Sequence, residues 1–227
     1  MASEQGRAVR ALLAELLGTF ALVFAGTGAI IVNDVSGGRV THVGIGLVFG
    51  LVVMAMIVAL RDTSGAHLNP AVTIGFAAAR QLSWKSVPGY VGGQVAGAVI
   101  ASLVLKALFP SHATLGTTLT TGGAAQSFVL ETMLTFLLMV VVLSVSSGAK
   151  ENAVAAPLAV GGVVTLDALF GGPISGASMN PARSLGPALV SGHLENLWLY
   201  LVAPCLGSLL AVVISQVLRQ TEKLEAR

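Results

Sequence analysis

The chain has 227 residues, of which 55% are hydrophobic and only 10% are charged, and its mean hydropathy is +0.87. Soluble domains carry about 25% charged residues, so this composition excludes an ordinary water-soluble domain and favours a protein that spans a lipid bilayer. The formal charge of +2 is too small to indicate a nucleic-acid partner. The single cysteine, Cys205, excludes an internal disulfide and any metal site built from several cysteines.

Six apolar segments are long enough to cross a membrane, since a spanning helix needs about 20 residues. They cover residues 11–32, 40–60, 86–108, 127–147, 153–171 and 196–218. The first segment contains Glu15, which the core of a cleaved signal peptide would not tolerate well, so we interpret it as a permanent span. Two further apolar segments, 69–79 and 180–190, begin at Asn-Pro and are too short to cross.

Basic residues fall mainly on one side of the predicted bundle. If both termini are cytoplasmic, that side holds Arg7, Arg10, Arg61, Arg80, Lys85, Lys150, Arg219, Lys223 and Arg227. Only Arg39, Lys106 and Arg183 lie elsewhere. The positive-inside rule therefore favours a multi-pass protein of the cell membrane with both termini in the cytoplasm. The uncharged segment 109–126, rich in Thr and Gly, is expected to link two halves on the outside.

The two halves of the sequence repeat each other. SGAHLNPAVTIG at 64–75 returns as SGASMNPARSLG at 175–186, with seven of twelve positions identical. Glu15 likewise returns as Glu131. Three spans therefore recur as three spans, and because three is odd the second copy enters the membrane from the opposite face.

This duplication predicts the domain organisation. We expect a single transmembrane channel domain over residues 1–227, made of inverted repeats at about 10–108 and 127–218.

Each Asn-Pro motif predicts the start of a short helix. Asparagine is a favoured N-cap, and proline at the first helical position gives up no hydrogen bond that the helix needs. About ten residues reach ~15 Å, half of a ~30 Å hydrocarbon core, so the half-helices after Asn69 and Asn180 should meet end to end near the midplane. Non-helical backbone at that depth must be buried or line water, so residues 64–68 and 175–179 should border a pore with their carbonyls.

Such a pore favours uncharged molecules. Each half-helix carries about half a positive charge at its N-terminus, and two such ends repel a cation or hydronium ion. If the side-chain oxygens of Asn69 and Asn180 cap their own helices, their NH2 groups remain free to donate to a passing water and interrupt a proton wire. Arg183, on the same helical face as Asn180, adds a second barrier to cations, whereas its repeat counterpart is Val72.

These residues resemble the aquaporin, or major intrinsic protein, family. The resemblance rests on the motifs Asn69-Pro70-Ala71 and Asn180-Pro181-Ala182 in their repeated contexts, on the duplicated glutamate and on Arg183. The phrase GGPISGASMNPARSLGPALV is most similar to the nodulin-like intrinsic proteins of plants and their microbial relatives. The resemblance implies an all-α membrane protein with six transmembrane helices plus two re-entrant half-helices, one pore per subunit and usually a homotetramer.

The resemblance also implies a four-residue constriction, which falls without gaps on Phe49, Ala168, Ala177 and Arg183. Strictly water-selective relatives have histidine where Ala168 stands, so a wider ring would admit glycerol or urea. Glycerol facilitators, however, typically have aspartate where Ser184 stands, and nodulin-like relatives usually have Trp or a smaller residue at Phe49. Two interpretations stay open: a channel for water and small uncharged solutes, or a facilitator of glycerol or uncharged metalloid acids with low water conductance.

Several polar residues also allow two interpretations. Glu15 and Glu131 are expected to accept hydrogen bonds from the re-entrant backbones as structural acids, and the alternative is proton transport. His67 either donates to a passing solute or is satisfied by loop carbonyls. Phe49 either lines the pore or is a packed aromatic. Asp167 is expected to be a solvated or capped group at a helix end.

Other classes of protein fit the sequence less well. A secondary transporter also has inverted repeats and broken helices, but this chain is short and, apart from Glu15 and Glu131, lacks midplane ionisable groups for coupling. No cluster of His with Asp, Glu or Ser indicates an enzyme, and the other histidines lack the spacing of metal ligands. We therefore expect no catalytic activity, cofactor or metal, and the partners should be water, small neutral solutes and the lipid bilayer.

Overall fold

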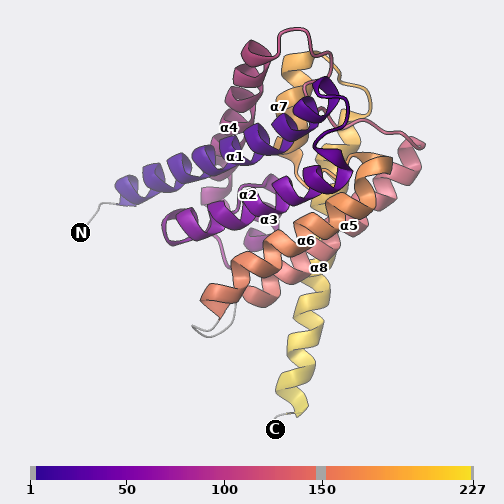
Figure 1. Cartoon of the computed structure of the whole chain (residues 1–227). Helices are drawn as coiled ribbons and strands as arrows, with labels where there is room; N and C mark the ends of the chain where they lie inside the picture. The colour runs from indigo at the N-terminus through magenta and orange to yellow at the C-terminus, as the bar shows by residue number, and fades with distance from the viewer. Residues whose placement is uncertain (1–3, 147–151, 226–227) are drawn as a thin grey trace.

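The computed structural model describes residues 4–146 and 152–225, and in these ranges it contains helices and no strand (Figure 1). The elements are α1 (Glu4–Val35), α2 (Thr41–Ser64), α3 (Pro70–Ala78), the 3₁₀ turn η1 (Trp84–Ser86), α4 (Val87–Leu108), α5 (Ala124–Val145), α6 (Asn152–Ser175), α7 (Pro181–Ser191) and α8 (Leu197–Glu225). The two helices that follow the Asn-Pro motifs, α3 and α7, are the short ones. The expected order of three spans and one half-helix per repeat is therefore present.

Among the described residues, six helices are long and apolar enough to span a membrane, namely α1, α2, α4, α5, α6 and α8. Most of them extend beyond the predicted segments, and the largest extensions are at α1, which begins at Glu4, and α8, which ends at Glu225. Hydropathy identifies only the part of a helix that lies in the hydrocarbon of the bilayer. The helical backbone hydrogen bonds continue beyond that part into residues that lie in water. Large apolar side chains such as Leu51, Val58 and Phe170 are more than half exposed on the outer faces, as a lipid-facing surface requires.

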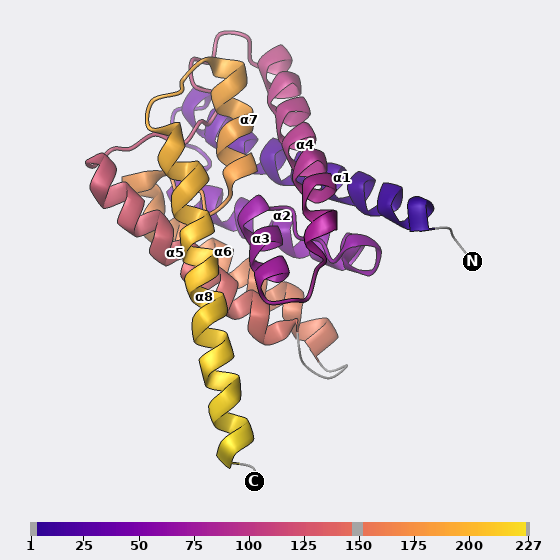
Figure 2. The same ribbon diagram turned by 180° about the vertical axis from the view of Figure 1, so that it is seen from behind.

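Each half-helix packs against the opposite half of the chain. In the first half α1 packs on α4 and α2, and in the second half α5 packs on α8 and α6 in the same way. The half-helix α3 lies mainly against α8, whereas α7 lies mainly against α4 (Figure 2). This exchange brings the N-termini of α3 and α7 to the middle of the bundle.

Glycines permit the closest helix crossings. A Cβ atom on Gly97 of α4 would overlap the carbonyl oxygen of Leu16, and one on Gly207 of α8 would overlap that of Thr132. The two positions correspond in the repeats, so both halves use the same backbone-to-backbone approach. Small residues at such crossings are typical of membrane helices, because lipid gives no hydrophobic push between them.

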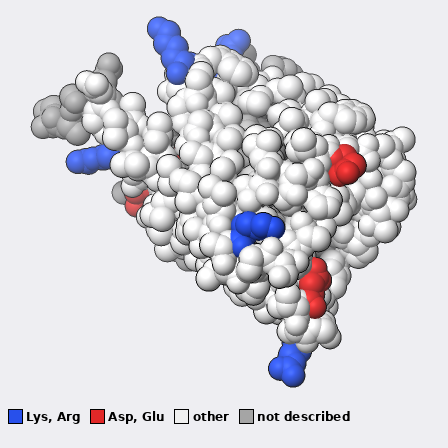
Figure 3. Space-filling view, turned by 90° about the horizontal axis from the view of Figure 1, so that it is seen from above, with Lys and Arg blue, Asp and Glu red and all other residues white. Residues whose placement is uncertain are grey.

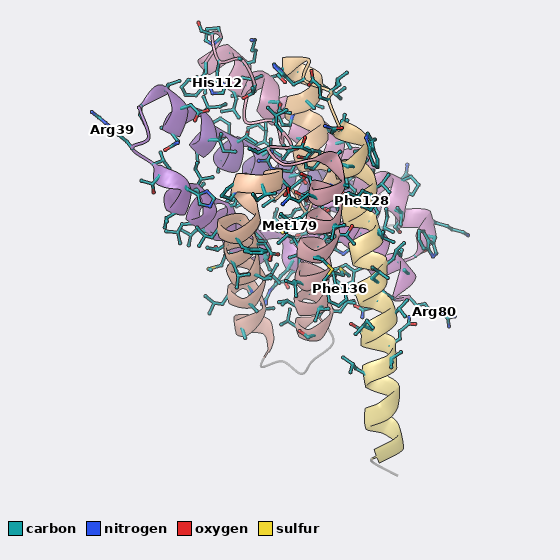
Figure 4. The ribbon with its side chains drawn as sticks, turned by 90° about the vertical axis from the view of Figure 1, so that its right-hand side faces the viewer. Arg39, Arg80, His112, Phe128, Phe136 and Met179 are labelled. Carbon is teal, nitrogen blue, oxygen red and sulfur yellow. The ribbon has the colours of Figure 1, made fainter. Side chains whose placement is uncertain are left out.

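Charged side chains are scattered at the ends of the bundle. Figure 3 shows isolated basic and acidic groups separated by wide uncharged surface. Arg80 lies toward the end from which α8 projects, whereas Arg39 lies at the opposite end (Figure 4). Of the basic residues used to predict the orientation, Lys150 and Arg227 and the side chains of Arg219 and Lys223 lie outside the described residues.

We expect Gly207→Val to destabilise the fold, because the added side chain must push α8 away from α5. Overpacking of this kind costs about 1–3 kcal/mol, and thermal unfolding in detergent should show a lower midpoint. Gly162→Val is the matched control, since a Cβ atom at Gly162 of α6 meets nothing within 4 Å. Equal midpoints for the two variants would contradict the close crossing.

Candidate functional site

The two asparagines cap the half-helices as the sequence predicts. Asn69 Oδ1 accepts a hydrogen bond from the backbone nitrogen of Ala71 at 2.9 Å. Asn180 Oδ1 accepts from the nitrogens of Ala182 at 3.0 Å and Arg183 at 3.3 Å. Each asparagine has extended backbone while the following proline begins the helix. Each side-chain oxygen therefore caps its own helix, and the side-chain amide nitrogen is available for other hydrogen bonds.

The amide nitrogens join the two halves of the molecule. Asn69 Nδ2 donates to the carbonyl of Met179 at 2.7 Å, and Asn180 Nδ2 donates to the carbonyl of Leu68 at 2.8 Å. These bonds hold the N-termini of α3 and α7 against each other. They also correct the expectation that each NH2 group stays wholly free for the lumen, because each amide has two hydrogens and one is used here. One donor per asparagine remains.

A buried glutamate organises each re-entrant backbone. Glu15 accepts from the nitrogens of His67 at 2.9 Å and Leu68 at 2.7 Å. Glu131 accepts from the nitrogens of Ser178 and Met179, both at 2.8 Å. With their N–H groups turned toward the carboxylates, these segments leave the carbonyls to face the other side. This orientation of the peptide groups requires left-handed backbone angles, with positive φ, at several positions of each segment. They are Gly65, Ala66 and Leu68 in the first repeat and Gly176, Ala177 and Met179 in the second.

Hydroxyl groups complete the same pattern in both repeats. Ser64 and Ser175 each donate to their glutamate at 2.7 Å. Tyr90 then donates to the carbonyl of Ser64 at 2.8 Å, and Tyr200 donates to that of Ser175 at 2.6 Å. Sequence reasoning did not predict the bonds of Tyr90 and Tyr200.

The proton arrangement at His67 follows from its neighbours. Thr73 Oγ1 donates to the carbonyl of Asn69 at 3.1 Å and accepts from Gln94 Nε2 at 2.9 Å. The contact of 3.1 Å between His67 Nδ1 and Thr73 Oγ1 must therefore be donated by the ring. In the neutral ring this leaves Nε2 as an acceptor. Phe76 stacks on the ring at 4.4 Å between centroids, and Tyr90 packs against it at a tilt of 44° and 4.9 Å.

A cavity of about 420 Å³ runs past the junction of the half-helices. Its wall brings together seven of the residues singled out in the sequence, which are Phe49, His67, Asn69, Ala168, Ala177, Asn180 and Arg183. The remaining residues of the two motifs, Pro70, Ala71, Pro181 and Ala182, are buried in the first turns of α3 and α7. Glu15 and Glu131 lie behind the wall, fully buried.

At one end of the cavity Arg183 lies beside Phe49. Its guanidinium carbon is 5.1 Å from the centre of the Phe49 ring, and its Nη1 donates to the carbonyl of Gly116 at 2.9 Å. The Phe49 ring in turn occupies space that a side chain at Gly26 would fill. Gly116, in the link between α4 and α5, is a site residue that sequence reasoning missed.

The rest of the wall is apolar and was also missed. Val53 and Ile57 follow Phe49 at helical spacing on α2, and Val160 and Val164 precede Ala168 in the same way on α6. The sequence signal that could have identified these lining residues is their i, i+4, i+8 spacing from a constriction residue. In a membrane helix this stripe is as apolar as the lipid-facing side, so hydropathy alone does not separate the two.

Asp167 differs from the expectation of a solvated or capped helix end. It lies inside α6, which continues to Ser175, and its side chain is fully buried. Neither carboxylate oxygen has a hydrogen-bond partner within residues 4–146 and 152–225. The helix end was misplaced because Gly171, Gly172 and Pro173 suggest a break that the helix does not make.

Within the described ranges, a bundle of six spanning helices encloses a cavity at which two half-helices meet, and this arrangement defines a membrane channel. The sequence matches the family model described as Major intrinsic protein over residues 2–215. It is 45% identical over 220 residues to "Aquaporin NIP1-2" of Oryza sativa subsp. japonica, covering 93% of this chain and 72% of the relative. It is 43% identical over 224 residues to "Aquaporin NIP3-1" of Arabidopsis thaliana, covering 95% of this chain and 69% of the relative.

A solved structure shares the fold. The X-ray structure of the aquaglyceroporin from Plasmodium falciparum superposes with a TM-score of 0.78 at 30% identity, covering 90% of this chain and 94% of that chain. The chain therefore belongs to the major intrinsic protein family, and its curated relatives are nodulin-like intrinsic proteins. It is a multi-pass membrane channel for water and small solutes.

Glu131→Gln should destabilise the re-entrant segment between α6 and α7. The carboxylate accepts three hydrogen bonds with its two oxygens. The amide of glutamine has only one oxygen, and its NH2 group would face a backbone N–H group, which is also a donor. Leaving buried donors unpaired costs about 1–3 kcal/mol each, so thermal unfolding should occur at a clearly lower temperature. Glu195→Gln, on an exposed loop residue, is the control. A Glu131→Gln protein that unfolds at the wild-type temperature would contradict the structural role of this carboxylate.

Proposed function

We propose that this channel conducts water and small uncharged solutes passively and excludes protons and ions. The observation that carries the proposal is the junction of α3 and α7, where Asn69 and Asn180 bond across to Met179 and Leu68 inside the cavity. Two helix N-termini at one point of the lumen create a positive potential that opposes cations. The remaining N–H of each asparagine donates to a passing water, which is then oriented with its oxygen toward both donors and cannot relay a proton.

The wall of the cavity suits amphipathic neutral molecules. One side carries residues 65–69 and 177–180 of the re-entrant segments, and the other carries the aliphatic side chains of α2, α5 and α6. A small polyol can place its hydroxyls on the carbonyls and its carbon chain on the apolar side. His67 adds an acceptor at Nε2 on the inner stretch of this path.

The constriction of Phe49, Ala168, Ala177 and Arg183 is proposed to set the size limit. Two of the four side chains are single methyl groups, so the ring has room for more than water. The names of the similar proteins, nodulin-like aquaporins and an aquaglyceroporin, support glycerol-sized solutes alongside water. Facilitation of glycerol or uncharged metalloid acids with low water conductance is the second candidate, and the same two methyl groups favour it.

The buried acids are assigned structural roles. Glu131 accepts three hydrogen bonds, one from a serine hydroxyl and two from backbone N–H groups. Glu15 accepts the same three kinds of bond from its own repeat and a fourth from the side-chain amide of Gln94. A carboxylate so occupied is a poor proton carrier. This arrangement disfavours the secondary-transporter alternative, which would need a midplane group that changes protonation or binds a coupling ion.

We extend the proposal to the setting of the channel. Residues 1–227 act as one channel domain of two inverted repeats, near 10–108 and 127–218, in the cell membrane. Arg61 lies in the last turn of α2, Lys85 lies in η1, and Arg80 lies toward the end from which α8 projects, so the positive-inside rule favours a cytoplasmic position for both termini. Each chain encloses its own cavity, which fits a homotetramer with one pore per subunit. We infer a channel rather than an enzyme, with no cofactor.

Ala168→His should reduce glycerol flux far more than water flux, because an imidazole fills the ring and leaves room for water alone. We expect glycerol permeability to fall about tenfold or more, as for a pocket that must exclude a larger group. Stopped-flow light scattering on proteoliposomes measures both fluxes, and Ala168→Ser is the control that keeps the side chain small. Equal loss of both fluxes would show that position 168 is not the size filter.

The same proteoliposomes separate a channel from a transporter. A passive pore should give glycerol uptake that rises linearly with the gradient. Uptake that saturates and depends on a proton or sodium gradient would support the transporter alternative.

A further inference from the structure

We propose that His112 is a positioning residue for Arg183 and that it acts through the carbonyl of Gly116 in the link between α4 and α5. Protonation of His112 would then change the selectivity of the pore. The inference rests on the proposed role of Arg183 in the constriction.

The link holds two adjacent residues of α7. Gly116 accepts from Arg183 Nη1 at 2.9 Å, and Thr118 Oγ1 donates to Ser184 Oγ at 2.7 Å. Arg183 is only 2% exposed, and its Nε has no partner within the described part of the chain. The position of the guanidinium therefore depends strongly on where the Gly116 carbonyl lies.

Leu115 fixes the position of Gly116. Its side chain is fully buried in a small cluster with Ile31 of α1 and Leu105 of α4. Its backbone has a φ of 52°, in the left-handed region that costs a residue with a β-carbon free energy. Its N–H donates to His112 Nδ1 at 3.0 Å. This bond stabilises the unfavourable backbone conformation of Leu115, which directly precedes Gly116, the residue whose carbonyl accepts from Arg183.

The proton on His112 follows from its two contacts. Because Nδ1 accepts from Leu115, it carries no hydrogen, and the neutral ring must then be protonated at Nε2. Nε2 lies 3.3 Å from Asp34 Oδ2 and donates to that carboxylate. A second proton on the ring would sit on Nδ1 and face the Leu115 N–H, so the buried N–H would lose its acceptor. Asp34 would meanwhile retain the imidazolium at the site.

The consequence for the pore has a definite direction. When Leu115 moves, the Gly116 carbonyl moves with it and releases Arg183 Nη1. The released guanidinium can recover acceptors from water in the lumen, so it turns inward beside Phe49 and narrows the ring. Acidification should therefore reduce glycerol flux more than water flux.

Other ionisable groups at this end of the bundle define the controls. From the neighbouring elements these are Asp34 on α1, Lys106 on α4, whose Nζ donates to the Pro110 carbonyl at 3.1 Å, and His193 after α7. Arg39, which lies at the same end as His112 in Figure 4, and Glu195 are exposed. His42, at the start of α2, lies with its Nε2 2.9 Å from the Leu169 carbonyl oxygen of α6.

The test compares glycerol and water permeability of proteoliposomes at pH 7.5 and 5.5. For the wild type, the ratio of glycerol to water permeability should fall about two- to tenfold on acidification, the factor that one hydrogen bond is worth. His112→Asn keeps an acceptor near the Nδ1 position and cannot be protonated, so its ratio should stay at the neutral value at both pH values. His112→Ala should have the low ratio at both, and His193→Asn and His42→Asn should respond as the wild type does.

A wild-type pH response that persists in His112→Asn would overturn the inference, as would a wild-type ratio that does not change with pH. Unchanged water flux in His112→Asn shows that this variant is folded even if His112→Ala is not. Arg183→Val in the same assay separates this inference from the proposed filter. If Arg183→Val changes the glycerol-to-water ratio but the His112 variants do not, only the inference on His112 fails. If Arg183→Val leaves the ratio unchanged, the proposed filter fails.

Discussion

The rest of the structure depends on the contact between the two half-helix N-termini. Each asparagine uses its oxygen to cap its own helix and one amide hydrogen to bind the backbone of the other half. This reciprocal use of one side chain places two partial positive charges at the middle of the cavity. Without these bonds, no side chain would hold the two N-termini together, and the cavity would lack both its central donors and its barrier to cations.

The two glutamates make this contact possible by ordering the backbone that leads to it. Glu15 and Glu131 draw successive N–H groups to one side, so the carbonyls face the other. Polar backbone at membrane depth is tolerated only when its groups are paired or line water, and this arrangement does both. The pore is thus polar along the re-entrant segments and apolar along α2, α5 and α6.

The sequence predicts most of this fold, because its signals are local. Span lengths, the N-caps at Asn69 and Asn180 and the repeated motifs follow from residue chemistry at short range. Contacts made by the α4–α5 link were not predictable, since nothing local to Gly116 or His112 indicates that they lie near Arg183. The apolar lining was missed because lumen and lipid accept the same residues. Asp167 was misplaced because Gly and Pro suggested a helix end.

Proton exclusion at the junction of α3 and α7 is the central claim, and one measurement tests it most directly. Proteoliposomes containing the protein are given an osmotic gradient and, separately, a pH gradient with a potassium ionophore to clamp the voltage. The account predicts rapid water flux through the protein together with a proton leak no greater than that of empty liposomes. A protein-dependent proton current that accompanies the water flux would contradict it.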